Sequence, residues 1–430
     1  MVDTVINSGV GGGANPQGER IVGFWGRRGP LFRILLMNSL LGLLTFGIYR
    51  FWARTRLRQY FWNSIEIDGD LLEYTGRGLE LFIGFLIVVA VLVPLLIGYQ
   101  FISIFLQTNA PDIFIAVNFL YFIGIFWLTR YAYFRARRYR LARTVWRGIR
   151  GGQDGSAAGY AWLWFGYAVL SVITFGWAVP WMTVELQKYE VEHARFGVEN
   201  FRYDGTGTAL LRYWIPCGVV LSIVVVAAIV TTVVYWAELQ LLFDSVTNLG
   251  TDPSSIAEDV GKIFAWTYGL IIIAYLILIP FYIYYRIAAL RYMISASNLS
   301  EVGFVAEFSG WRLVGYWVLY FLVVIGLIAV VVLLVATFGV VAALSGVEEV
   351  ADPGLAAVGI ILSVIPIILL LFFLPMINLL LFYYPVIRHI ATTLRLTDIS
   401  SLERIVQSSR DDPRFGEGLA AALDVDVGGF

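Results

Sequence analysis

Long apolar runs alternate with short segments rich in arginine and aromatic residues along this 430-residue chain. Each run is close to or above the roughly 20 residues that a helix needs to cross a bilayer. The runs are apolar on every side, which is typical of helices surrounded by lipid. They predict helices at residues 31–52, 81–106, 113–134, 160–183, 214–236, 263–285, 314–343 and 357–387.

The segments between the apolar runs resemble one another. The clearest copy, residues 45–76, begins with Thr-Phe-Gly, continues through several arginines and ends with Tyr-Thr-Gly. A second copy, residues 174–205, begins with Thr-Phe-Gly and ends with Tyr-Asp-Gly, and fainter copies lie at residues 135–155, 285–310 and 384–395. Repetition at long spacing predicts a fold built from internal repeats.

Short strands are expected at the ends of these segments. Ile65–Ile67 and Leu71–Tyr74 flank Asp68-Gly69, a dipeptide that favours a two-residue hairpin turn. Phe201–Tyr203 alternates in the same way, and strands from several segments should pair into a small sheet under the membrane. The predicted fold class is an all-α integral membrane protein: a multi-pass helical bundle built from internal repeats, with short cytoplasmic β-hairpin segments.

Composition agrees with a membrane protein. The chain is 59% hydrophobic and 14% charged, against roughly 25% charged residues in soluble domains. We expect residues 1–20 to form a disordered arm without a signal peptide, residues 21–400 the transmembrane domain, and the acidic, small-residue stretch 401–430 a disordered tail.

Charge separates the polar segments into two classes. Acidic residues occupy the segment around Asp112 and the stretches 237–262 and 346–352, whereas arginines follow the third helix at residues 130–150. The positive-inside rule places the arginine segments and both termini in the cytoplasm and the acidic loops outside.

Two apolar runs, 31–52 and 160–183, conflict with that orientation if each is one crossing. They would put successive arginine segments on opposite sides of the membrane. We therefore predict re-entrant or interfacial hairpins broken at Phe46-Gly47 and Phe175-Gly176, which leaves six true spans. The alternative is eight plain spans.

Enzyme, metal and cofactor chemistry finds little support in the sequence. Cys217 is the single cysteine, and only His193 and His389 could join it as ligands. Phosphate-loop, nucleophile-elbow and His-Glu-x-x-His motifs are missing from the sequence. We expect a protein that is not an enzyme and has no cofactor.

The clustered arginines admit three interpretations. They are topology signals, contacts to anionic lipid headgroups, or nucleic-acid contacts, and the net charge of −1 makes the last the weakest. We expect the lipid bilayer as partner and no nucleic acid. The candidate contacts to anionic phospholipid are Arg54, Arg56, Arg58, Arg135, Arg137 and Arg138.

A second candidate site lies in the last apolar run. Pro366, Pro375 and Pro385 surround Asn378, and interrupted helices can line a transport site. The alternative is a packing kink satisfied by neighbouring helices. This stretch is the candidate pore or broken-helix region.

The residue patterns resemble a known family. Residues 45–58, 73–86 and 146–156, together with Pro180-Trp181-Met182, are similar to signature stretches of the bacterial YjgN-like inner-membrane proteins, a family of unknown function. The resemblance covers about residues 22–400, weakens after Gly205, and implies a multi-pass protein of the bacterial plasma membrane. The leading hypothesis is a transporter- or channel-like bundle, and the alternative is a membrane scaffold or anionic-lipid-binding protein with an arginine-rich cytoplasmic cap.

Overall fold

The computed structural model divides the chain into two compact units. Unit 1 comprises Met1–Ala157, His193–Phe201 and Asn298–Phe430, and unit 2 comprises Ala158–Glu192 and Arg202–Ser297. The residues that the structure describes are 20–234, 236, 240, 253–344, 353–410 and 416–423. The expected N-terminal arm up to residue 19, and most of the acidic stretches 237–252 and 346–352, lie outside the described residues.

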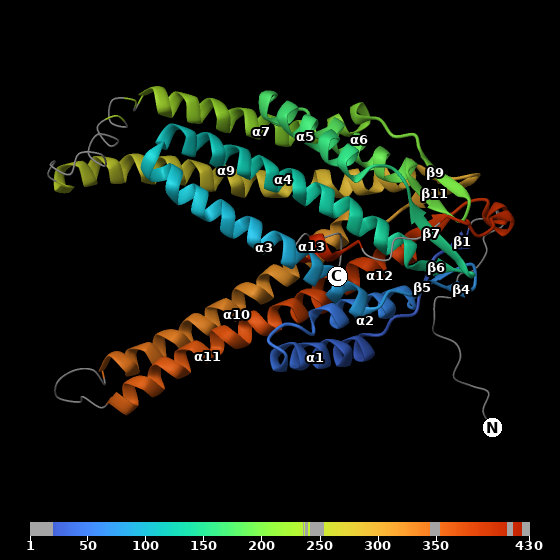
Figure 1. Cartoon of the computed structure of the whole chain (residues 1–430), viewed down its shortest axis with the longest axis horizontal. Helices are drawn as coiled ribbons and strands as arrows, with labels where there is room; N and C mark the ends of the chain where they lie inside the picture. Colours follow the sequence, from blue (N-terminus) through green and yellow to red (C-terminus); the bar gives the residue numbers. More distant parts are fainter. Residues whose placement is uncertain are drawn as a thin grey trace. The chain divides into compact units, whose positions relative to one another are not determined.

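Helices make up most of both units (Figure 1). Those of unit 1 are α1 (Arg28–Leu44), α2 (Arg50–Trp62), α3 (Gly78–Asn109), α4 (Pro111–Ala142), α10 (Gly310–Leu344), α11 (Pro353–Asn378), the π-helix η1 (Leu379–Tyr383), α12 (Tyr384–Thr393), the 3-10 helix η2 (Ile399–Arg404) and α13 (Gly418–Ala422). Those of unit 2 are α5 (Ala157–Ile173), α6 (Val179–Glu192), α7 (Gly207–Val234) and α9 (Pro253–Ser295).

The strands are short and lie almost entirely in unit 1. They are β1 (Arg20–Ile21), β2 (Gly23–Phe24), β3 (Ile65–Ile67), β4 (Asp70–Leu71), β5 (Glu73–Tyr74), β6 (Thr144–Trp146), β7 (Ile149–Gln153), β8 (Ala194–Phe196), β9 (Glu199–Tyr203), β10 (Ser297–Leu299), β11 (Val302–Ala306) and β12 (Leu394–Leu396). Among the described residues, one sheet has the order β1-β12-β11-β10-β9-β8-β7-β6-β5 and another the order β2-β3-β4.

The two sheets join into a closed ring of strands. β1 runs on through Val22 into β2, and β4 runs on through Leu72 into β5. Because β3 pairs with both β2 and β4, it connects the two edges of the larger sheet. Ring closure leaves no long unpaired edge, a common hazard of open sheets. The sequence predicted a small sheet, and the sheet found is curled and larger.

Strand pairing fixes where each helical hairpin starts and ends. β2 precedes α1 and pairs with β3, which follows α2. β5 and β6 flank α3–α4, β7 and β8 flank α5–α6, and β11 and β12 flank α10–α12 in the same antiparallel manner. Each of these helical hairpins therefore leaves the strand ring and returns to it at a neighbouring strand.

An apolar core fills the ring. Trp146, Leu299 and Val302 are buried there, with Val302 fully inaccessible to solvent. Ile399, Leu402 and Ile405, which follow β12, pack into the same cluster. The ring interior is consequently a packed core, held together mainly by the burial of apolar surface.

Two-residue turns connect neighbouring strands as the sequence predicted. Asp68 and Gly69 have φ of 51° and 86° between β3 and β4. Arg147 and Gly148 repeat the conformation between β6 and β7, with φ of 49° and 76°. Positive φ at both positions matches the right-handed twist of the flanking strands. Leu71–Tyr74 is not one strand, however, because the chain changes sheets at Leu72.

The Thr-Phe-Gly motifs form turns between helices. Phe46 and Gly47 have φ of 50° and 84° between α1 and α2, and Phe175 and Gly176 have φ of 50° and 86° between α5 and α6. In both turns the threonine hydroxyl donates to a carbonyl four residues earlier and accepts an N–H four residues later. The expected helix breaks are confirmed, so residues 31–52 do not form one plain span.

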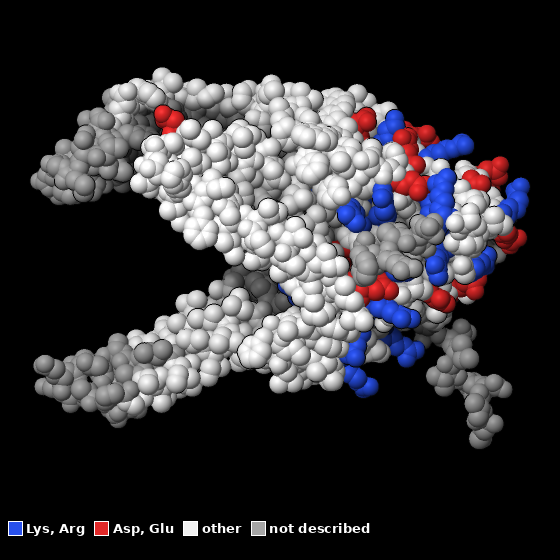
Figure 2. Space-filling model, viewed as in Figure 1, with Lys and Arg blue, Asp and Glu red and all other residues white. Residues whose placement is uncertain are grey.

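Apolar helices long enough to cross a membrane follow the predicted ranges. Within the described residues, six helices qualify by length and composition: Gly78–Asn109, Pro111–Ala142, Gly207–Val230, Leu276–Ser295, Gly310–Val340 and Ala357–Thr393. The two ranges predicted as hairpins contribute none of them. In Figure 2 charged side chains gather over the strands and the adjoining helix ends, whereas the visible lengths of α3, α10 and α11 beyond them are almost entirely uncharged.

The C-terminal stretch is not the disordered tail expected after residue 400. Ser401, Leu402 and Ile405 are buried against the strand ring, and Ala420 and Ala421 are buried between helices. Small residues had suggested a lack of core-forming side chains, but here they allow close packing. Residues 411–415 and 424–430 of the expected tail lie outside the described residues.

Candidate functional site

Exposed arginines of unit 1 lie over aromatic rings. Arg56 stands 5.4 Å from the Tyr49 ring centre, and Arg135 stands 5.9 Å from that of Tyr131. Further exposed examples pair Arg28 with Tyr384 and Arg50 with Phe51 and Phe85. Such pairs hold a guanidinium group by cation–π attraction while leaving part of it open to other ligands.

The structure separates the six arginines nominated from the sequence. Arg56 and Arg135 are exposed, whereas Arg54 and Arg137 are half-buried and have further interactions. Arg138 donates to the carbonyl oxygen of Asp154 (3.2 Å) and to that of Gly155. The prediction that Arg58 is a surface contact for lipid is wrong, because its side chain is only 3% exposed.

Arg58 instead belongs to a buried cluster. Its Nη1 donates to Glu417 Oε2 at 2.7 Å and to the Tyr74 hydroxyl at 3.0 Å. Arg140 Nε lies 3.9 Å from Glu417 Oε1. Burial alone would lower the pKa of Arg58, but the Glu417 carboxylate and Tyr74 raise it above its usual value. Helices α2 and α4 thus each place a guanidinium group beside one carboxylate from the C-terminal stretch, and β5 adds the Tyr74 hydroxyl, which is bound to Arg58.

A second acid lies beside this cluster. Glu80 Oε2, at the start of α3, accepts from the Tyr139 hydroxyl at 2.7 Å and lies 2.9 Å from Arg143 Nη2. Burial lowers the pKa of Arg143, but its contacts to Tyr139 and Glu80 outweigh that and raise the pKa. The start of α3 and the end of α4 are therefore tied together by charge-assisted hydrogen bonds.

Residues 416–423, called the C-terminal plug below, occupy the space between α3 and α4. A Cβ on Gly418 would lie 2.0 Å from the carbonyl oxygen of Gly84, and one on Gly416 would lie 2.7 Å from Tyr139 Cβ. Ala420 packs with Ala132 and Ala136 of α4. Only small residues allow the plug to approach both helices closely enough for Glu417 to reach Arg58.

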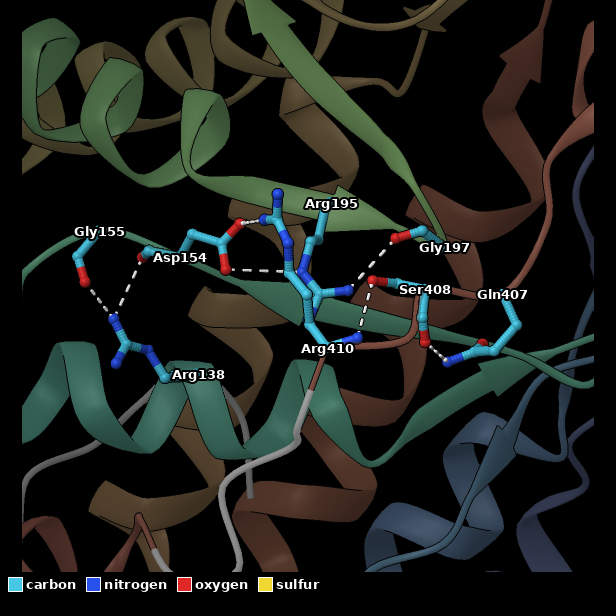
Figure 3. Close-up of polar contacts among 8 residues, drawn as sticks. All are labelled: Arg138, Asp154, Gly155, Arg195, Gly197, Gln407, Ser408 and Arg410. Carbon is cyan, nitrogen blue, oxygen red and sulfur yellow. Dashed lines mark hydrogen bonds and ion pairs between the residues drawn. The ribbon is translucent and has the colours of Figure 1, made fainter.

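A second polar network anchors the residues before the plug (Figure 3). Asp154 Oδ1 lies 3.6 Å from Arg195 Nε, and Asp154 Oδ2 pairs with Arg410. Gln407 Oε1 accepts from the Arg150 N–H at 2.7 Å, and Val198 N donates to the Val406 carbonyl oxygen at 3.1 Å. The C-terminal stretch is therefore bound to β7, to Asp154 just after it, and to the turn between β8 and β9 before it reaches α3 and α4.

The expected broken helix is continuous. Pro366 and Pro375 lie within α11, Asn378 ends it, and Pro385 lies near the start of α12. Between them Leu379–Tyr383 form a π-helix, so the backbone widens without unwinding. The prolines lack the N–H groups of a regular helix, and a π segment is one way for the chain to accommodate such gaps.

Sequence reasoning missed the plug and its glutamate. The signal available was Gly416-Glu417-Gly418 followed by a run of leucine and alanine, which fits a closely packed segment as well as a flexible one.

Across the described ranges, no group of three or more His, Cys, Asp and Glu residues could hold a metal ion. The chemistry that the residues offer is anion binding by guanidinium and phenol groups.

Comparison with known proteins gives a family model that covers most of the chain and a named relative that covers a small part of it. A family model described as "Bacterial protein of unknown function (DUF898)" matches residues 20–421. The "Inner membrane protein YjgN" of Salmonella typhimurium is 37% identical over 65 residues, which cover 15% of this chain and 16% of that protein. No solved structure matches the chain. The YjgN-like resemblance is confirmed, and this name together with the six apolar helices supports an inner-membrane location.

Proposed function

Since the chain belongs to the DUF898 family of bacterial proteins of unknown function, we propose a function from its own residues: a non-enzymatic membrane protein that binds anionic lipid headgroups on the cytoplasmic side. The observation that carries this proposal is the set of exposed arginines over aromatic rings in unit 1, represented by Arg56 and Arg135. Aromatic side chains favour the interface between lipid and water, and arginines there attract anionic headgroups.

The positions of these arginines fit the proposal. Arg135 lies in α4 seven residues before its end at Ala142, next to the strands, and Arg56 lies on α2, which ends shortly before β3. A side chain of this length can bring its charged group to the headgroup level while its stem stays among apolar residues. The cytoplasmic assignment rests on the positive-inside rule.

Neutralising two exposed arginines tests the proposal. Each arginine near the surface contributes about 1 kcal/mol to the binding of anionic lipid. The double variant Arg56→Gln/Arg135→Gln should therefore lower the preference for phosphatidylglycerol over phosphatidylcholine roughly 30-fold. Native mass spectrometry of protein released from mixed nanodiscs measures the lipids retained.

The matched control removes the same charge elsewhere. Arg202 and Arg404 are also exposed, but they belong to β9 and η2. Arg202→Gln/Arg404→Gln should leave lipid preference close to that of the unmodified protein. Equal losses in both double variants, or no loss in either, would contradict a specific arginine surface.

A gated transport bundle is the second candidate function. It is favoured by the π-helix Leu379–Tyr383, which follows Asn378 inside the apolar helical stretch Ala357–Thr393. π segments are frequent at functional sites because they shift the helix register and free backbone carbonyls. Asn378 would supply the polar side chain of such a site.

Flux through proteoliposomes tests this candidate. Asn378→Leu should slow the release of small entrapped solutes about tenfold, which corresponds to one lost polar interaction of about 1.4 kcal/mol. Asn118→Leu is the control, because Asn118 Oδ1 accepts from Tyr99 and so has a structural partner. Release no faster than from protein-free liposomes would remove transport from consideration.

A further inference from the structure

One carboxylate lies between two guanidinium groups in the interior of unit 1. Glu417 is 5% exposed and contacts Arg58 at 2.7 Å and Arg140 at 3.9 Å. Tyr74 extends the same cluster through its hydrogen bond with Arg58. The cations come from α2 and α4, whereas the anion is brought by a short segment near the C-terminus.

The plug packs onto the pair α3–α4, but a comparable pair of helices can pack without one. In unit 2, α7 and α9 pack directly against each other, more extensively than α3 packs on α4. In unit 1 the plug takes up part of the space between α3 and α4. α13 spans only Gly418–Ala422, and helices this short are unstable alone, so its structure depends on docking.

We propose that Arg58, Arg140 and Tyr74 form a binding site for a phosphate group, and that Glu417 is the internal ligand that occupies it. A phosphate monoester carries a charge of about −1.5 to −2 at neutral pH, which suits two guanidinium groups better than one carboxylate does. Guanidinium groups also bind phosphate oxygens in a bidentate manner. The phosphate could belong to a lipid headgroup or to a molecule in solution.

Because the Glu417 carboxylate is buried, we expect a phosphate to replace it rather than the carboxylate to leave an empty site. If the carboxylate left without replacement, the buried ion pair between Arg58 and Glu417 would be broken in a poorly hydrated position, which is strongly unfavourable. A phosphate that enters as Glu417 leaves avoids this cost. Binding of the ligand is therefore coupled to release of residues 416–423. This site is separate from the exposed arginines proposed above as a lipid surface.

Hydrogen exchange of residues 416–423 in phosphatidylcholine nanodiscs tests the coupling. Dioctanoyl phosphatidic acid and inorganic phosphate are added separately, and dioctanoyl phosphatidylcholine serves as the phosphodiester control. We expect at least one of the first two to accelerate exchange of the plug in a saturable manner. A response to phosphatidic acid alone identifies a lipid ligand, and a response to inorganic phosphate identifies a soluble one.

Charge variants then distinguish a site from a general salt effect. Glu417→Gln keeps the shape of the side chain but removes the competing charge, so it should accelerate plug exchange without ligand and tighten phosphate binding about tenfold or more. The exposed Glu403→Gln, on η2, is the matched control and should change neither.

Arg58→Gln alone could fail to fold, because it removes the nearer of the two cations beside the buried Glu417. The double variant Arg58→Gln/Glu417→Gln avoids that and should lose the response to phosphate. The proposal is overturned if neither phosphate source accelerates plug exchange in the unmodified protein, or if the double variant responds as strongly as the unmodified protein. The lipid preference of Arg56→Gln/Arg135→Gln and the hydrogen exchange of the plug are separate measurements. Either proposal can therefore be rejected while the other stands.

Discussion

The ion pair between Arg58 and Glu417 joins residues 359 positions apart in the chain. Neither side chain carries a local signal of its partner. Arg58 lies among other arginines on α2, and Glu417 lies among small residues that are typical of flexible tails. By contrast, Asp68-Gly69 was predicted correctly, because a two-residue turn depends on the φ angles of its own residues. Local conformation was readable from the sequence, and long-range charge pairing was not.

The backbone contact of Gly418 with Gly84 gives a prediction at the same scale. In Gly418→Ala the new Cβ would lie 2.0 Å from the Gly84 carbonyl oxygen, and a helix backbone cannot move away. Overpacking of this kind costs about 1–3 kcal/mol, so the plug should undock and exchange its amide hydrogens faster. Ala422→Ser, at a half-buried position, is the control and should leave exchange unchanged. If the amide hydrogens of the plug exchanged as slowly in Gly418→Ala as in the unmodified protein, the docked position of the plug would be refuted.

Among the elements, helices were predicted better than strands. Hydropathy places the long apolar helices because each one needs a continuous run of about 20 residues. The helix breaks after Thr45 and Thr174 were also recognised, since Phe-Gly supplies the positive φ that ends a helix. Strands β1, β2, β4 and β5 span two residues each, too few for any alternation to be visible. Their pairing is set by the ring rather than by their own sequence.

The last apolar helix shows a different limit. Three prolines around Asn378 suggested an interrupted helix, and the sequence could not distinguish unwinding from widening. The structure keeps the helix intact through the π segment Leu379–Tyr383. The choice depends on packing, because Met376 and Tyr384 on either side are buried against Leu31 and Leu35 of α1. A helix that is packed on both sides of a π segment can change its register there and still remain one continuous helix.

At the scale of the whole molecule, the strand ring bears on membrane topology. Phe24 in β2 and Asn200 in β9 precede different apolar helices, yet both belong to the same ring. The strands of one ring pair with each other and cannot lie on both sides of a bilayer. The hypothesis of eight plain spans does not fit this arrangement. The depth of the α1–α2 and α5–α6 hairpins in the lipid stays a prediction.

Cysteine labelling tests the orientation directly. In a variant without Cys217, cysteines introduced as Phe24→Cys or Asn200→Cys should react with impermeant reagents from one compartment only, the cytoplasm. The reagent should label both cysteines in inverted membrane vesicles. It should label neither in intact cells with a permeabilised outer membrane. A cysteine at Asp112, in the first turn of α4, should show the opposite pattern. Labelling of residues 24 and 200 from different sides would rule out a common ring.

β1 and β12 come from opposite ends of the described chain, and their pairing of Arg20 with Leu396 and of Ile21 with Arg395 completes the circle of strands. During synthesis β1 lacks this partner until β12, at Leu394–Leu396, has been made. A chain that stops before residue 394 has no means of closing the circle. Such a truncated chain would leave β1 and β11 with unpaired edges, and strand edges of this kind tend to pair with other molecules.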